Sequence, residues 1–162
     1  LSVLGGFRYL QLNDTLSTTL NNNVATGRYG FENEMYGGQM GLDLLLPDPI
    51  DALDLRVVGK AGLYANHYGG GIREFQGNNF IGTFAGADNS TAFVGDLVFS
   101  ASYWFNDHIA LRAGYQLLWI GDVALAGEEA SRSILNPNLL QNPQHGSDLF
   151  MHGAMVGLEF QL

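Results

Sequence analysis

The sequence has no cysteine, no long apolar run and few basic residues. Without cysteine there is no disulfide, which fits an outer-membrane protein and also many soluble ones. No window approaches the roughly 18 consecutive apolar residues of a membrane-spanning helix, so that class is excluded. Seven Lys and Arg stand against 16 Asp and Glu, and the net charge of −9 argues against nucleic-acid binding and against electrostatic docking on anionic lipid.

Residues 53–66, LDLRVVGKAGLYAN, alternate in polarity. The odd positions, from Leu53 to Ala65, carry no polar side chain, whereas the even positions include Arg56 and Lys60. A period of two predicts a β-strand with two unlike faces. The run is long enough to cross a bilayer at a tilt, which takes about 9–11 residues. The Arg56 face must meet water or counter-charges, and the other face meets a protein core or lipid.

The same alternation predicts strands over residues 2–13, 28–45, 53–66, 91–105, 109–121 and 148–162. Their connections alternate between long loops, at 14–27, 67–90 and 122–147, and short turns, at 46–52 and 106–108. Transmembrane barrels show this alternation, with long loops outside and short turns on the periplasmic side. A soluble sandwich has no reason for it. The adjacent Gly37 and Gly38 suggest a bulge or a bend in the barrel wall.

The sequence therefore predicts an all-β protein, an antiparallel up-and-down transmembrane β-barrel of the bacterial outer membrane, with both termini periplasmic and residues 1–162 in one barrel domain. Six strands cannot close a barrel of the usual size, about 8–26 strands. We expect upstream strands, other subunits or extra strands from residues 72–90 to complete it. The chain begins at Leu1 without Met, which favours the later part of a longer polypeptide.

Ionisable residues fall on the predicted inward faces of these strands. Because a charge facing lipid is costly, we place all of them toward the lumen. They either line a pore and select solutes by field and hydrogen bonding, or form a salt-bridged interior of the kind that fills barrels of about eight strands. Both interpretations stay open for these residues: Arg8, Asp43, Asp54, Arg56, Lys60, Asp96, Arg112 and Glu159.

Aromatic residues occur where the two interfacial girdles of a barrel are expected. The predicted girdles comprise Tyr103, Phe105 and Phe160 near the short turns, and Tyr115, Trp119 and Phe150 toward the long loops. The last residues also resemble the C-terminal signal read by the barrel-assembly machinery, because Gly157, Phe160 and Leu162 match its glycine and two hydrophobic positions. The expected partners are that machinery, the lipid bilayer and lipopolysaccharide, and no nucleic acid.

Several motifs, in their order along the chain, carry a family resemblance. Residues 6–10 read GFRYL, residues 36–42 read YGGQMGL and residues 157–160 read GLEF, with Lys60 and Gly114-Tyr115 between them. Together they resemble the outer-membrane β-barrel family of planctomycetes, which are Gram-negative bacteria, known as beta-barrel porin family seven. The resemblance spans nearly the whole chain. It implies an outer-membrane barrel, and because family members are longer, it implies that this chain is the C-terminal part.

No catalytic, cofactor or metal site is expected. The histidines, His67, His108, His145 and His152, are scattered and show no ligand spacing. Ser131, His145 and Glu129 share one predicted loop, but nearness in sequence supplies no triad geometry. We therefore predict a protein that is not an enzyme.

Three functional hypotheses remain. The first is a porin-like passive channel for small solutes. The second is a non-conducting barrel that anchors or scaffolds a cell-surface assembly through the predicted loops at 67–90 and 122–147. The third is a soluble lipocalin-like barrel, which would bury the apolar face and expose Arg56 and Lys60.

Overall fold

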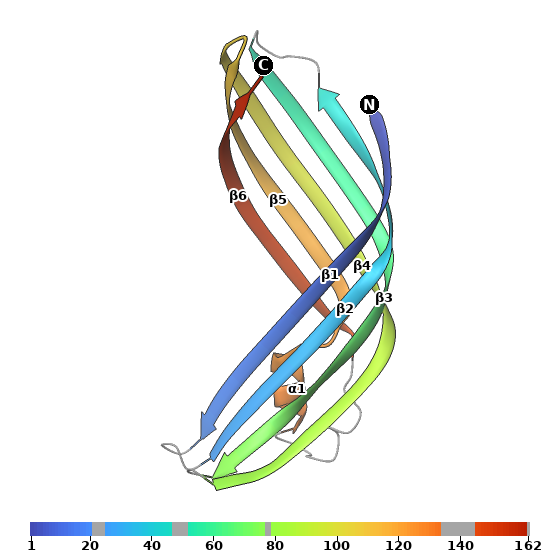
Figure 1. The fold of residues 1–162 in the computed structure, drawn as a ribbon, viewed down its shortest axis with the longest axis vertical. Coiled ribbons are helices and arrows are strands. Elements are labelled where there is room, and N and C mark those ends of the chain that lie inside the picture. Colours follow the sequence, from blue (N-terminus) through green and yellow to red (C-terminus); the bar gives the residue numbers. More distant parts are fainter. Residues whose placement is uncertain (21–24, 47–51, 77–78, 134–144, 162) are drawn as a thin grey trace.

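The chain forms one antiparallel sheet that curls into half of a barrel, as the computed structural model shows (Figure 1). The structure describes residues 1–20, 25–46, 52–76, 79–133 and 145–161. Six strands lie in chain order, and each pairs only with its sequence neighbours. They are β1 Ser2–Leu20, β2 Ala25–Leu46, β3 Leu53–Gln76, β4 Asn79–Asn106, β5 Ile109–Val123 and β6 Ser147–Phe160. The predicted all-β, up-and-down architecture is confirmed.

The sheet has two distinct ends, the near end and the far end. The near end holds both described termini, Leu1 and Gln161, and the turn at Asp107 and His108 (Figure 1). The far end is the opposite one, where β1 passes to β2 and β3 passes to β4. Within the described ranges, no helix is long and apolar enough to cross a membrane.

The strands run much farther toward the far end than predicted. β3 has 24 residues and β4 has 28, and their pairing continues to Gln76 opposite Asn79. β1 and β2 likewise pair as far as Leu20 opposite Ala25. The predicted loops are therefore wrong over residues 14–20, 25–27, 67–76 and 79–90, and residues 21–24 and 77–78 lie outside the described ranges. Residues 72–76 and 79–90 lengthen β3 and β4 and add no strand to the sheet.

The reason lies in the backbone rather than in the side chains. These stretches are rich in Gly, Asn and Thr, a composition typical of loops. A ladder, however, satisfies backbone N–H and C=O groups whatever the side chains are, provided that a neighbouring strand supplies partners. Gly69, Gly70 and Gly71 stay in β3 because β2 and β4 pair with them on both sides.

Alternation gives the sheet two unlike faces. The convex face exposes large apolar side chains on every strand, for example Val3, Phe7, Met40, Leu63, Phe99, Trp119, Val156 and Leu158. The concave face carries Arg56 and Lys60 in register with concave-side partners, whereas Arg28, Glu32, Glu34 and Arg73 lie on the convex side toward the far end. A soluble barrel of the third hypothesis needs the opposite arrangement.

The curl of the sheet crowds its concave face, and glycine relieves the crowding. A Cβ at Gly37, on the concave side of β2, would overlap the backbone of Leu63 and Tyr64 on β3. At Gly38, on the convex side, no atom lies within 4 Å of that position. The β2–β3 pairing shows no register shift here, so these glycines permit a bend and form no bulge.

Apolar side chains fill the concave face toward the far end, in two clusters. One comprises Tyr29, Phe31, Tyr68, Ile72, Ala124, Ala126 and Ala130, with Leu16 packed against it. The other comprises Met35, Tyr64, Ala92, Val94, Ile120 and Val123. The concave face is therefore polar in its near half and largely apolar in its far half.

Candidate functional site

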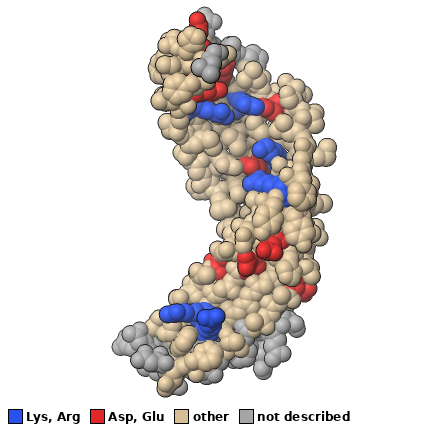
Figure 2. Space-filling view, in the orientation of Figure 1, with Lys and Arg blue, Asp and Glu red and all other residues tan. Residues whose placement is uncertain are grey.

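All eight ionisable residues predicted to face the lumen lie on the concave face, in the near half of the sheet. The strand pattern explains their common side, because successive side chains alternate between the faces of a sheet. Figure 2 shows basic and acidic side chains interspersed along the curved surface rather than gathered into one patch.

Arg8 and Asp96 form an ion pair between strands that are not adjacent. Arg8 lies on β1 and Asp96 on β4, and the Arg8 Nη1 to Asp96 Oδ2 distance is 3.4 Å. The Asp96 carboxylate is almost fully buried and also accepts a hydrogen bond of 2.8 Å from Gln116 Nε2 of β5. Three strands thus converge on one carboxylate across the hollow of the sheet.

The other charges mostly find local partners nearer the near end. Arg56 donates from Nε to Asp43 Oδ1 over 2.8 Å, and its Nη2 donates to the second carboxylate oxygen. Asp54 accepts from Trp104 Nε1 at 2.8 Å. Two further charged residues bond serine hydroxyl groups. Ser102 Oγ donates to the Glu159 carboxylate at 3.2 Å, and Arg112 Nη2 donates to Ser100 Oγ at 3.3 Å.

Lys60 differs from the other basic residues on this face. It lies opposite Asp96 in the β3–β4 register, but Asp96 is bound by Arg8 and Gln116. Among the described residues, no carboxylate lies within 4.0 Å of the Lys60 ammonium. An ammonium with no carboxylate in direct contact is favoured by water around it.

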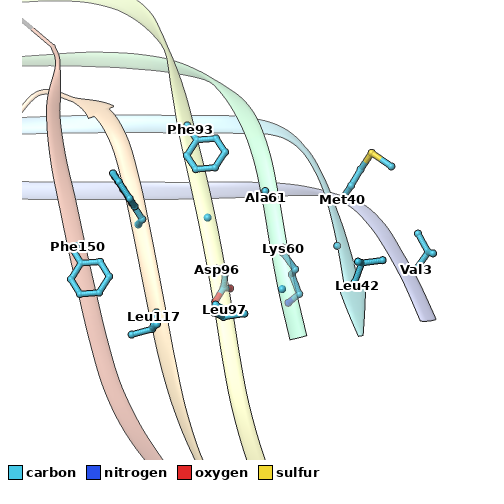
Figure 3. Close-up of a pocket in the computed structure, with 14 residues that line it drawn as sticks. Val3, Met40, Leu42, Lys60, Ala61, Phe93, Asp96, Leu97, Leu117 and Phe150 are labelled. Atoms are coloured by element: carbon cyan, nitrogen blue, oxygen red, sulfur yellow. The ribbon is translucent and has the colours of Figure 1, made fainter. Parts of the chain in front are cut away.

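The convex face at the same height is apolar and carries the predicted girdle residues. Tyr103, Phe105 and Phe160 are exposed near the near end, and Trp119 pairs with Phe150 farther along. Tyr115 lies between these groups and contacts His152. A shallow hollow of about 720 Å³ lies on this face, and Figure 3 shows residues that line it. Gly59 and Gly95, which lack a side chain, and the small Ala61 line its floor. Its larger lining residues include Met40, Phe93, Trp119 and Phe150.

A chain segment that sequence reasoning placed in a loop enters the concave face. Within the predicted connection 122–147, Asp122 and Val123 still belong to the end of β5 and residues 126–133 form helix α1, Ala126–Ser133. The segment 122–133, called the inward segment below, contacts β1 and β2. Figure 1 shows α1 lying against the first two strands.

The inward segment is tied to the sheet by a buried amide. Asn33 Nδ2 donates to the Ala124 carbonyl at 2.8 Å, and the Ala124 N–H donates to Asn33 Oδ1 at 2.9 Å. Asn66 Nδ2 donates to the same Asn33 oxygen at 3.1 Å. Ser90 Oγ adds a bond of 3.2 Å to the Asp122 carbonyl. The Asn33 side chain therefore pairs with Ala124 as a strand backbone would.

The comparison with known families decides what this chain is. The family model described as "Putative beta barrel porin-7 (BBP7)" matches residues 1–162, the whole chain. The chain belongs to the BBP7 family. No curated protein and no solved structure matches it.

In this BBP7 chain, the concave face is the candidate lumen and the inward segment lies within it. No group of three or more metal-ligating side chains occurs in the described part of the chain. His145 and Asp122 are in contact, with 2.6 Å from Nδ1 to Oδ1, but Ser131 donates to the Gly127 carbonyl within α1 instead. Ser131 is thus not hydrogen-bonded to His145, and the side chain of Glu129 lies outside the described part of the chain.

Sequence reasoning missed the inward segment of this BBP7 protein, although one signal pointed to it. Asn33 and Asn66 both fall on the concave side of their strands, at 0% and 1% exposure. A buried amide on a strand already has its own backbone paired, so its side chain needs another partner. Two such amides at neighbouring concave positions indicate that further backbone packs against the concave face there.

Proposed function

We propose that this chain forms part of the wall of an outer-membrane channel that passes small solutes. The BBP7 family match, the apolar convex face and the charged concave face support this function. The convex band, with aromatic residues toward its two edges, has the character of a lipid-facing surface. In this arrangement lipid and lipopolysaccharide contact the convex face, and the concave face meets water.

Lys60 is the observation that carries the proposal. A dry interior would leave this ammonium without a carboxylate in direct contact, and desolvating such a group is unfavourable. A water-filled lumen hydrates it at little cost. The Arg56 side chain, 47% exposed beside Asp43, is likewise consistent with an aqueous surface.

The proposed channel has weak preference between anions and cations. Four basic residues, Arg8, Arg56, Lys60 and Arg112, are matched by four acidic ones, Asp43, Asp54, Asp96 and Glu159. Such a lining is close to neutral overall, so pore size rather than net field would govern passage.

The proposal also covers orientation and assembly. The near end, with both described termini, would face the periplasm and the far end the outside. The unpaired outer edges of β1 and β6 would pair with further strands or with other subunits, because lipid does not tolerate open sheet edges. Gly157 and Phe160 would serve the barrel-assembly machinery. Leu162, the third residue of the predicted signal, lies outside the described residues.

A non-conducting scaffold is the second candidate, and a specific observation favours it. The far half of the concave face is packed with Tyr29, Phe31, Met35, Tyr64 and Tyr68, and the inward segment lies among them. An interior filled in this way at one end is typical of barrels without an open channel.

Conductance of the purified protein in planar bilayers separates the two. A steady single-channel current supports the channel. The Lys60→Glu variant must also shift the reversal potential in the direction of cation selectivity, which assigns the current to this protein. Folding is checked by the gel-mobility difference between heated and unheated samples. No current from protein that passes this check contradicts the channel and favours the scaffold.

A further inference from the structure

We propose that the inward segment, residues 122–133, narrows the lumen and sets the size limit for solutes, with Asn33 as the residue that positions it. This inference rests on the proposed channel function and adds a determinant of selectivity to it. Residues 124–133 of this segment lie outside the six strands, and Ala124, Ala126 and Ala130 are buried against the concave face.

The tether at Asn33 is strong because it lies where water does not reach. Both hydrogen bonds between Asn33 and Ala124 are buried. Breaking them leaves a backbone donor and a backbone acceptor unpaired in an apolar environment, which is unfavourable. The segment is therefore held in one place rather than resting loosely on the sheet.

A second contact fixes the start of the helix. Asp14 of β1 accepts a hydrogen bond of 2.9 Å from the Ala126 N–H. The first N–H groups of a helix have no partner within it, and a carboxylate there also interacts favourably with the helix dipole. Asp14 thus holds the α1 N-terminus against β1, while Asn33 holds Ala124, two residues earlier, against β2.

Small side chains let the helix approach the sheet closely. Ala124, Ala126 and Ala130 are buried against the aromatic cluster that contains Tyr29 and Tyr68. The opposite side of the helix includes the exposed Gly127 and Glu128. A helix with its side chains is about 10 Å wide, so α1 takes up a substantial part of the space in front of the far half of the sheet.

Thiol chemistry tests this placement directly, because the natural chain has no cysteine. Gly127→Cys puts one thiol on the exposed side of α1, where a Cβ meets no atom within 4 Å. Asn13→Cys is the matched control, since Asn13 is exposed on the convex face beside Asp14 and so lies at the same height outside the lumen. The probe is a charged methanethiosulfonate reagent added during recording of single-channel current.

The reagent should reduce the current of the Gly127→Cys channel by roughly half, because it enlarges a helix that already narrows the path. It should leave the Asn13→Cys channel unchanged. An unchanged current in both variants, with labelling verified by mass, overturns the constriction and leaves the channel function standing.

The Asn33→Ala variant tests the tether with a second readout. Released from Asn33, the segment should admit larger neutral sugars into proteoliposomes and raise conductance, relative to Asn13→Ala. Folded Asn33→Ala with natural conductance and size limit overturns the role of Asn33. If neither the natural protein nor folded Asn33→Ala conducts, the channel function fails, and the constriction fails with it.

Discussion

A pair of neighbouring substitutions on β6 tests which face of the sheet meets lipid. Ala154 is exposed on the convex face opposite Tyr115, and Gly153 is exposed on the concave face opposite Gln116. Both lie midway along β6, and no atom lies within 4 Å of a Cβ added at Gly153. Arginine therefore has room at either exposed position. Replacing glycine rather than alanine adds a backbone effect below about 1 kcal/mol, which is smaller than the effect of the surrounding medium expected below.

The expected difference is large. An arginine on the lipid face of a barrel costs about 2–4 kcal/mol near the bilayer midplane, which is roughly a 30- to 1,000-fold change in the unfolding equilibrium. Ala154→Arg should therefore lower the free energy of unfolding by about that amount. Gly153→Arg places the same charge in the water-filled hollow, and its cost should stay below about 1 kcal/mol.

Unfolding in guanidinium chloride, with the protein refolded into lipid vesicles, measures both variants. Tryptophan fluorescence is a suitable signal, because Trp119 lies on the convex face at 52% exposure. Equal losses for the two variants, or a larger loss for Gly153→Arg, would refute the assignment of the convex face to lipid. The second result would instead support a soluble barrel with the apolar face turned inward.

Three further outcomes follow from the same geometry. Gly37→Ala should destabilise the protein by about 1–3 kcal/mol, because its Cβ overlaps the β3 backbone, whereas Gly38→Ala should be nearly neutral in the same unfolding assay. The half-exposed Arg56–Asp43 pair should show a coupling of only roughly 0.2–1 kcal/mol in a double-mutant cycle. Lys60→Glu should make the lining net acidic and so favour cations. The reversal potential across a potassium chloride gradient should then move measurably toward the potassium equilibrium potential. An unchanged reversal potential would place Lys60 away from the ion path.

The alternation of residues was sufficient to predict strands and faces. Arg56 and Lys60 share a side because the period of a strand is two, and no tertiary contact can change that within a continuous ladder. The same rule put Arg8, Asp96 and Arg112 on one face without any knowledge of their partners. Their role as a lumen lining stays a prediction, since a common face does not show an open path.

The alternation of residues could not predict where the strands end or where the inward segment packs. Residues 67–71, His-Tyr-Gly-Gly-Gly, have loop composition, and only pairing with β2 and β4 keeps them extended. The contact between Asn33 and Ala124 joins residues 91 positions apart. Such a contact depends on the curl of the whole sheet, which no local pattern contains. The ion pair of Arg8 with Asp96 has the same origin.

Because the strands follow one another in strict sequence order, a sheet of this kind can gain or lose strands one hairpin at a time. Each strand pairs only with the one before and the one after it, so an inserted or deleted pair of strands would change the circumference without repacking a shared core. Barrels with different numbers of strands could then keep the same alternation of apolar and polar residues along each strand. The inward segment is the exception, because it binds β5 to β2 across the hollow and so constrains which hairpins can be exchanged.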